Sequence, residues 1–475
     1  MTSIRPVQSL SALTILLAGA LLVLRWLTTE FGAGTLTLEH PVVALCSAMI
    51  VAGIAWFAMV LVFRKHPISG RVMLAIFLLL GLAMRLIFFD SKPVYENDYK
   101  RYLWDGAVVA SGENPYRFSP TEVFEAGKPG ARSIPDLTWL AMKSNEAGYI
   151  TSEINSPTLT TIYPPAAQAV FTAAYAIAPY ERWGLRLVFL IIEILGFVAL
   201  LAGLRARNIS LSWGAAYWLN PMIIFTTYNG VHMDVLLVAP IMAALLWVGR
   251  HPFRAGVMLS LAAAIKIWPL LLAPVLFRGW RHRPVIYIGV AALVGGLTLM
   301  SLAPMLLTLK AEAGLAAYSK NWTNSSFIFP GLRDALGPGL RETLGIVLES
   351  PDRIARYIIA GGLTALSLWF GFIKPQNETL IPAHLMILSA AFVFLSPTGY
   401  PWYFIWFWMF LPFALQHWSV RGLAFLAVGA AAYFARFKIG EEGYYDIYSE
   451  VLLPLEFGIP LLILAWDGWK AKRHA

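Results

Sequence analysis

Uninterrupted apolar runs recur along almost the whole 475-residue chain, and they constrain its fold more than any other feature. A helix needs about 20 apolar residues to cross the hydrocarbon core of a bilayer. About twelve runs of roughly that length occur, at 8–27, 42–63, 71–89, 187–204, 211–229, 234–249, 285–306, 353–372, 380–396, 400–416, 420–436 and 451–467. For two further segments, 161–179 and 255–277, the sequence leaves open whether they cross the membrane. The pattern predicts an all-α polytopic integral membrane protein with about 12–14 transmembrane or membrane-embedded helices.

Composition supports this class. The chain is 58% hydrophobic and 13% charged, whereas soluble domains are about 45–50% apolar and about 25% charged. The runs are continuous rather than alternating, which argues against a membrane β-barrel. The single cysteine, Cys46, excludes an intramolecular disulfide and a cysteine metal cluster.

The net charge of +9 is better explained by topology than by nucleic-acid binding, because Lys and Arg gather in cytoplasmic loops. The basic loops are 64–71, 205–208, 249–254, 278–283 and 470–474. With these loops in the cytoplasm, four polar segments fall together on the outer face: 90–160, 229–234, 319–326 and 396–403. We expect a single transmembrane domain over 1–475, with large outer loops at 90–160 and 307–352. Its partners would include membrane lipids but no nucleic acid.

This topology leads to two predictions about the ambiguous segments. Segment 161–179 should not fully cross, and 255–277 should be a hairpin of two half-helices. In the second segment Lys266 lies close before Pro269, and the residue before a proline resists helix. Non-helical backbone at membrane depth is tolerated only inside protein or beside a wet cavity. Lys266 is therefore predicted at the floor of a cavity open to the outer face.

Charges and aromatic residues cluster in YENDYKRYLWDG, directly after an apolar run. Glu96, Asp98 and Asp105 lie close to Arg101 in the chain. If Asp98 begins a helix, its carboxylate is favoured there by the helix dipole. Asp98 and Arg101, and Arg101 and Asp105, would then share a face. A solvated loop with interfacial aromatic anchors would show much the same pattern.

Other polar residues end or interrupt apolar segments. His232 and Asp234 in NGVHMD are an ionisable pair at membrane depth, which favours a functional role over an interfacial cap. Lys266 lies about ten residues from either end of its segment, too far to reach an interface easily, so an anion such as phosphate is its natural partner. One histidine and scattered carboxylates are weak evidence for a metal site, so no cofactor is firmly predicted and a divalent metal stays open. Nucleotide-binding motifs such as a Walker A loop are absent from the sequence, which argues against a nucleotide-sugar donor.

With these residues in view, the chain resembles the GT-C glycosyltransferases, and in particular the bacterial mannosyltransferases that use a polyprenyl-phosphate sugar. The resemblance is carried by an ordered set of motifs: DYKRYLWDG with ENPY (98–116), INSPTLTTIYPP (154–165), LNP…NGVHMD (219–234), Lys-x-x-Pro (266–269), NWTNSSF (321–327) and SPTGYPWY (396–403). It implies a GT-C fold whose first outer loop has short juxtamembrane helices and an essential acidic residue. It also implies a bacterial inner-membrane enzyme with its active site facing the periplasm or exterior. About three spans precede the loop here, whereas many members have one.

The resemblance also implies site roles. Asp98 is the best match for the acid, acting as general base in an inverting transfer, with Asp105 and Glu96 as fallbacks. The expected donor-phosphate ligands are Lys266, His232 and Arg101. The expected sugar or acceptor contacts are Asp234, Tyr163, Asn324, Trp402 and Tyr403. Mannose is the expected sugar and a lipid-linked or cell-envelope glycan the expected acceptor; a transporter or flippase of a lipid-linked sugar or amphiphile is the alternative.

Overall fold

The computed structural model describes residues 4–31, 40–66, 71–126, 150, 153–308, 314–373, 377–438 and 447–473. In these ranges the regular structure is helical, apart from an isolated β-bridge between Asn324 and Thr398. Seven helices of the described ranges are long and apolar enough to cross a membrane: Pro6–Glu30, Val42–Lys65, Arg182–Ala206, Pro284–Leu306, Pro351–Phe372, Glu378–Leu395 and Tyr448–Arg473. The predicted all-α membrane class is confirmed.

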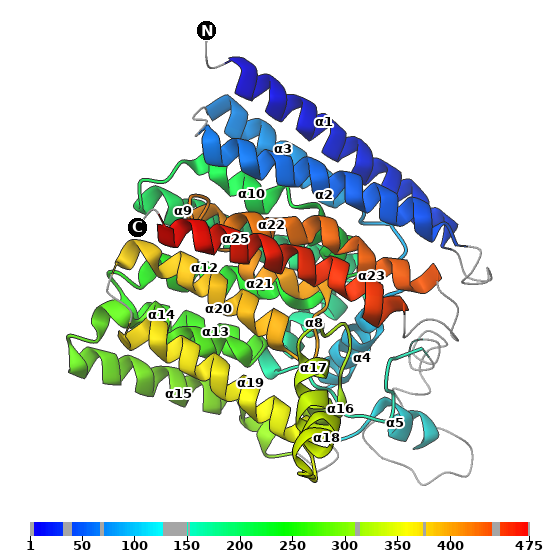
Figure 1. The fold of residues 1–475 in the computed structure, drawn as a ribbon. Coiled ribbons are helices and arrows are strands. Elements are labelled where there is room, and N and C mark those ends of the chain that lie inside the picture. The colour runs from blue at the N-terminus through cyan, green and yellow to red at the C-terminus, as the bar shows by residue number, and fades with distance from the viewer. Residues whose placement is uncertain are drawn as a thin grey trace.

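The long helices run side by side as one bundle (Figure 1). Helices α1 (Ile4–Leu27) and α2 (Val42–Lys65) pack together along one side of it. Helices α15 (Pro284–Leu306) and α19 (Pro351–Leu368) lie at the opposite side, and α9 (Arg182–Ala206) packs against α12 (Val238–Trp247). The remaining long helices are α20 (Ile381–Leu395) and α25 (Ile459–Arg473).

Five predicted spans are shorter or broken. Helix α3 covers Arg71–Leu86, and 400–416 divides into η11 (Pro401–Phe404), α21 (Ile405–Trp408) and η12 (Leu411–Phe413). Segment 420–436 divides into α22 (Val420–Gly429) and α23 (Ala431–Ala435), with η13 (Arg436–Lys438) after it. Segments 211–229 and 234–249 form a bent pair, Pro221–Asn229 with Met233–Trp247, at 113°. The break in the bent pair contains Val231, whose positive φ of 58° does not fit a right-handed helix.

Both predictions about the ambiguous segments hold for their local structure. Helix α8 (Pro165–Ile177) has 13 residues, about 20 Å at 1.5 Å per residue, too short for a 30 Å hydrocarbon core. Helix α13 (Pro252–Ile265) ends at Lys266, which is extended, and η6 (Trp268–Leu272) and α14 (Ala273–Leu276) follow. The Trp280 indole donates to the Val248 carbonyl at 2.7 Å, so the two ends of this segment meet as a hairpin.

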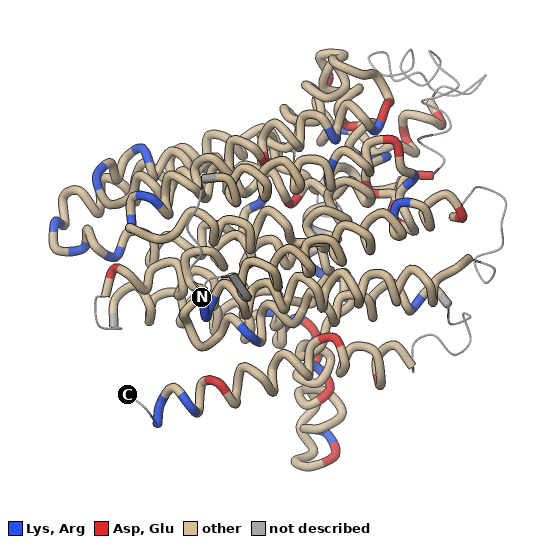
Figure 2. The backbone as a smooth tube through the Cα atoms, turned by 90° about the horizontal axis from the view of Figure 1, so that it is seen from above, with Lys and Arg blue, Asp and Glu red and all other residues tan. Residues whose placement is uncertain are grey.

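The two ends of the bundle differ in charge. Figure 2 shows Lys and Arg gathered at one end and most Asp and Glu toward the other. Short helices lie at the acidic end: α4 (Asp98–Ala110), α5 (Pro120–Ala126), α16 (Gly314–Asn321), α17 (Phe329–Asp334) and α18 (Leu340–Leu344). These helices belong to the two predicted outer loops, whose residues 127–149, 151–152 and 309–313 lie outside the described ranges.

Candidate active site

A cavity of about 650 Å³ opens where the short helices meet the bundle. Segments far apart in the sequence line it: the start of α4, residues 155–164, the breaks at 234 and 266, α16, and the segment 396–406. The predicted residues on its wall are Glu96, Asp98, Arg101, Tyr163, Asp234, Lys266, Asn324, Trp402 and Tyr403. The polar motifs that topology assigned to one face therefore converge on one cavity.

Residues 91–94, which precede α4, are hydrogen-bonded to the NGVHMD turn (229–234). The Asn229 side chain donates to the Ser91 hydroxyl (3.0 Å) and the Lys92 carbonyl (2.7 Å), and it accepts from the Val94 amide (3.1 Å). Arg186, buried on α9, donates to the carbonyls of Ser91 (2.7 Å) and Asn229 (3.3 Å). These bonds hold Glu96 and Asp98 beside His232.

The backbone is strained on both sides of this contact, before α4 and in the NGVHMD turn. Tyr95 has φ 59° and Val231 has φ 58°, a region that bulky and β-branched residues avoid. Strain of this kind costs of order 1–3 kcal/mol per residue and persists where surrounding contacts impose it. The Asn229 and Arg186 bonds supply those contacts.

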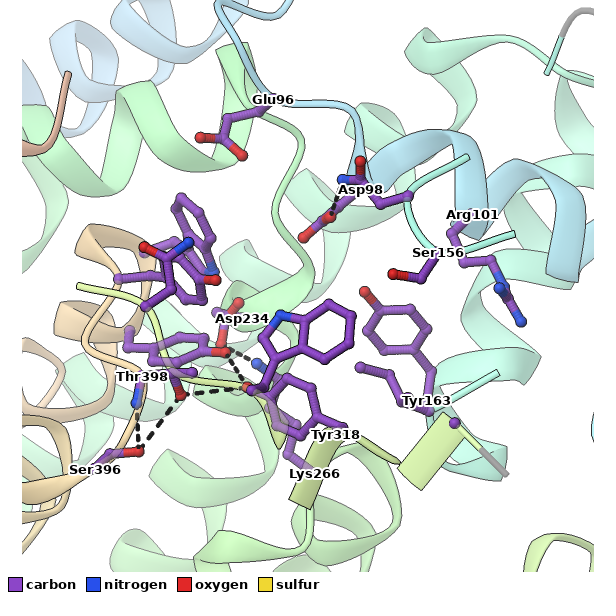
Figure 3. A pocket seen from close by; sticks show the side chains of 18 of the residues that line it. Glu96, Asp98, Arg101, Ser156, Tyr163, Asp234, Lys266, Tyr318, Ser396 and Thr398 are labelled. Atoms are coloured by element: carbon purple, nitrogen blue, oxygen red, sulfur yellow. Dashed lines mark hydrogen bonds and ion pairs between the residues drawn. The ribbon is translucent and has the colours of Figure 1, made fainter. Parts of the chain in front are cut away.

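Asp98 begins α4, as predicted, and its side chain points toward the Asp234–Lys266 pair (Figure 3). Its Oδ1 accepts from the Asn155 amide at 3.2 Å. Burial is the main cause that raises the pKa of Asp98 above its ordinary 3.8, while the Asn155 bond and the Lys266 charge oppose the rise. A carboxylate with a raised pKa is a stronger base, which suits a proton acceptor.

Glu96 lies two residues before Asp98 and lines the same cavity wall. Its Oε1 accepts from the Tyr433 hydroxyl at 2.9 Å. Burial first, and then the neighbouring Asp98 charge, raise the pKa of Glu96 to about 8. Glu96 is therefore mostly protonated at neutral pH, in contrast to an ordinary glutamate.

Lys266 and Asp234 form an ion pair across the cavity floor, with Nζ 2.6 Å from Oδ1. The Trp406 indole donates to the same oxygen at 2.8 Å. The ammonium also lies 4.5 Å from the Tyr403 ring centroid and 4.9 Å from that of Trp406. Lys266 is thus fixed by Asp234 and two aromatic faces, with its remaining N–H groups available to the cavity.

Asp105 does not line the cavity. It is 1% exposed, on the face of α4 that packs against α8. Its carboxylate accepts from Arg101 (2.9 Å), the Thr161 hydroxyl (2.5 Å) and the Gln168 amide (3.0 Å). The predicted Arg101–Asp105 pairing at i, i+4 is present. The Arg101 guanidinium also donates to the Leu159 carbonyl from both Nη1 and Nη2, at 3.1 Å each.

His232 lies behind the wall rather than on it. Its ring stacks on Trp402, with 3.6 Å between centroids and 9° between planes. Its Nε2 is 3.7 Å from Glu96 Oε2 and its Nδ1 is 3.8 Å from Asp98 Oδ2. His232 therefore lies between two carboxylates, and its predicted contact with the donor phosphate stays a prediction.

Arg436 is a cavity residue that sequence reasoning missed. Its guanidinium donates to Asn324 Oδ1 at 3.0 Å and to the Tyr433 hydroxyl, and it lies 3.8 Å from the Tyr433 ring centroid. The only available sign was an arginine near the end of an apolar run, which a basic interfacial anchor explains equally well. Only the fold brings it to Glu96 and Asn324.

Among the described residues, no three His, Cys, Asp or Glu side chains are grouped so as to hold a metal ion. The side chains that line the cavity include carboxylates, cations and aromatic rings. A carboxylate with a raised pKa beside several cations fits transfer of a group from an anionic leaving group.

Comparison with known proteins gives two matches. Residues 7–282 match the model of the MptA/MptB family, described as the alpha-(1->6)-mannopyranosyltransferase N-terminal domain. The chain is 25% identical over 390 residues to alpha-(1->6)-mannopyranosyltransferase B of Corynebacterium glutamicum, covering 73% of this chain and 59% of that relative. No solved structure matches. The family match extends over more than half of the chain, which therefore belongs to the MptA/MptB mannopyranosyltransferase family of membrane proteins.

Proposed function

We propose that this protein transfers mannose from a polyprenyl-phosphate-mannose donor to a lipid-linked or cell-envelope glycan at the outer face of the bacterial inner membrane. Membership of the mannosyltransferase family supports a transferase over a transporter. The observation that carries the proposal is the Asp98 carboxylate on the wall of the cavity, directed toward Lys266.

The proposed reaction forms one bond, breaks one bond and transfers one proton. The acceptor hydroxyl forms a bond to the anomeric carbon, while the bond from that carbon to the phosphate oxygen breaks. The phosphate leaves with the bonding electron pair, and Asp98 takes the hydroxyl proton. In-line attack inverts the anomeric centre, so an α-linked product requires a β-linked donor.

The leaving phosphate gains charge in the transition state, and fixed cations lower the barrier for such a step. Lys266 is the central candidate because its ammonium is immobilised within the cavity. Arg101 and Arg436 also line the cavity, the first held by Asp105 and the second by Tyr433. We assign Lys266 and Arg101 to the donor phosphate, with Arg436 as an addition to the predicted set.

The wall beside Lys266 suits a lipid donor. It is formed by Ile267, Trp268, Leu315 and Phe392, and Ile267 is 38% exposed on the surface of the protein. We propose that the polyprenyl chain packs along this apolar wall. Tyr163 offers an aromatic ring for the sugar, and Asn324 and Asp234 offer hydrogen-bonding groups. Trp402 stacks on His232 and Tyr400, and Tyr403 stacks on Trp406 beneath the Lys266 ammonium, so we assign only the edges of these two rings to the sugar.

The test is transfer by purified protein in detergent or nanodiscs, with radiolabelled polyprenyl-phosphate mannose and a synthetic α-mannoside acceptor. We expect labelled product that α-mannosidase releases, and no product from GDP-mannose. Transfer from GDP-mannose at a comparable rate would contradict the proposal. So would flux of the lipid-linked sugar across vesicles without any transfer.

A further inference from the structure

His232 occupies a position that the transfer reaction described above does not use. It is 2% exposed, and neither ring nitrogen has a hydrogen-bond partner among the described residues. A buried imidazole without partners is costly, so the ring is held there by other forces. It is sandwiched between the Trp402 ring and Gly230, where a Cβ atom would come within 2.9 Å of the imidazole.

The two ring nitrogens face different carboxylates. Nδ1 faces Asp98 Oδ2 at 3.8 Å and Nε2 faces Glu96 Oε2 at 3.7 Å. These distances are slightly longer than hydrogen bonds, and such contacts in free enzymes commonly tighten when substrate binds. A single imidazole therefore connects the candidate base to Glu96.

The second oxygen of each carboxylate is already engaged. The Tyr433 hydroxyl donates to Glu96 Oε1, which leaves Oε2 as the oxygen that carries the proton when Glu96 is neutral. Asn155 donates to Asp98 Oδ1, which leaves Oδ2 toward the imidazole. A protonated Glu96 can then donate to Nε2, and a neutral imidazole that accepts at Nε2 carries its proton on Nδ1.

We propose that His232 is a positioning residue whose tautomer is set by Glu96, so that its Nδ1–H holds Asp98 ionised and oriented for the acceptor hydroxyl. This inference rests on the proposed role of Asp98 as the base. It assigns Glu96 and His232 to the support of Asp98 rather than to proton abstraction or phosphate binding.

The arrangement has a consequence for pH dependence. Glu96 must be protonated and Asp98 ionised at the same time, so the rate rises with pH as Asp98 ionises and falls as Glu96 ionises, near its pKa of about 8. An ionised Glu96 would draw the imidazole proton to Nε2 and turn the Nδ1 lone pair toward Asp98. Lys266 and Asp234 are the other charges that act on Asp98, and Lys266 also acts on His232. Arg436 is the other charge that acts on Glu96.

The test is the pH profile of kcat over about pH 6–10 for the wild type and Glu96→Gln. A glutamine amide donates to Nε2 at every pH. We therefore expect Glu96→Gln to keep most of the activity at neutral pH and to lose the alkaline decline. Glu96→Ala removes the donor and is expected to lower kcat at neutral pH below that of Glu96→Gln.

His232→Asn keeps the test decisive if a Glu96 variant fails to fold. An asparagine amide can replace Nδ1–H toward Asp98 and has no tautomer to lose, so this variant should retain partial activity without the alkaline decline. His232→Gln, whose amide reaches toward Glu96 instead, should lose more.

The outcomes separate this inference from the function it rests on. An Asp98→Asn variant that transfers mannose at the wild-type rate would remove Asp98 as the base and this inference with it, but would leave mannosyl transfer itself in place. An inactive Asp98→Asn variant, with a folded Glu96→Gln variant that keeps the wild-type alkaline decline, would overturn the tautomer inference alone. A folded Glu96→Gln variant that is inactive at every pH would overturn it as well.

Discussion

Asp98 and Asp105 lie two turns apart on α4 but in different surroundings. Asp98 is at the first residue of the helix and on the cavity wall. Asp105 is in the middle of the helix, with three side-chain donors around its carboxylate. Asp98 is therefore the carboxylate that we propose as the base, whereas Asp105 holds Arg101 and joins α4 to residues 161–168.

Asp105→Ala is predicted to destabilise the protein strongly. It leaves Arg101, Thr161 and Gln168 with a lost acceptor, and breaking a buried ion pair from one side costs about 3–5 kcal/mol. The measurement is the midpoint of thermal unfolding in detergent.

Asp90→Ala is the matched control. Asp90 pairs with Arg25 at 2.8 Å, but its side chain is 78% exposed, and exposed ion pairs contribute little. An Asp105→Ala protein as stable as the Asp90→Ala protein would contradict the structural role of Asp105.

Residue-scale features were the hardest to obtain from the sequence. Spacing placed Asp98 at a helix start and paired Arg101 with Asp105, because both depend on local geometry alone. Residue spacing did not predict that Arg436 lies in the cavity. It also did not predict the buried Arg85–Glu193 ion pair (2.7 Å), whose carboxylate accepts hydrogen bonds from the Tyr217 and Tyr228 hydroxyls. Each of these depends on residues more than 20 positions apart, which no local pattern brings together.

At the scale of elements, the position of Asp98 depends on the close packing of α4 against α8. Gly106 makes this approach possible, since a Cβ atom there would lie 2.5 Å from the Phe171 carbonyl oxygen. One turn away, Tyr102 stacks on Phe171 with 4.5 Å between ring centroids. The first turn of α4 is therefore placed by backbone-to-backbone contact.

Gly106→Ala is predicted to separate α4 from α8 and to lower both the unfolding midpoint and the transfer rate. The added methyl meets backbone atoms, which cannot move aside as a flexible side chain would. Gly295→Ala in α15 is the control, because nothing lies within 4 Å of its added Cβ. Alanine in an open helical position is normally neutral or slightly stabilising. Equal behaviour of the two variants would contradict the packing account.

Element boundaries were predictable where proline or a polar residue interrupts an apolar run. The hairpin at 255–277 was anticipated from Lys266 and Pro269. The bend between Asn229 and Met233 lies between two predicted spans, 211–229 and 234–249. The sequence did not predict that the first helix of the bent pair would begin only at Pro221. Hydropathy measures apolar content, and helix bundles bury broken segments such as η11–α21–η12 as readily as continuous helices.

At the scale of the whole molecule, the charge difference between the bundle ends matches the topology expected from the basic loops. The cavity lies at the end with the short helices, opposite the loops 249–254 and 278–283. In the proposed orientation these basic loops are cytoplasmic and the cavity opens outward. Loop asymmetry and motif order sufficed to predict this division, because both are properties of the chain as a sequence.

Cysteine labelling tests this orientation. In a Cys46→Ala background, Glu349→Cys places a thiol on an exposed residue of the second outer loop, and Arg250→Cys places one on an exposed basic loop. A membrane-impermeant maleimide is expected to label Glu349→Cys in intact spheroplasts and Arg250→Cys only after permeabilisation. The reverse pattern would put the cavity on the cytoplasmic side and contradict an outer-face reaction.

The central claim is that Asp98 accepts the proton of the acceptor hydroxyl during mannosyl transfer. The most direct measurement is the single-turnover rate of Asp98→Asn with bound polyprenyl-phosphate mannose, beside the wild type and with the unfolding midpoint of both. Loss of a general base typically slows the chemical step about 10²–10⁴-fold, and we predict a loss of this size with donor binding and folding retained. A folded Asp98→Asn protein that transfers mannose at the wild-type rate would contradict the account.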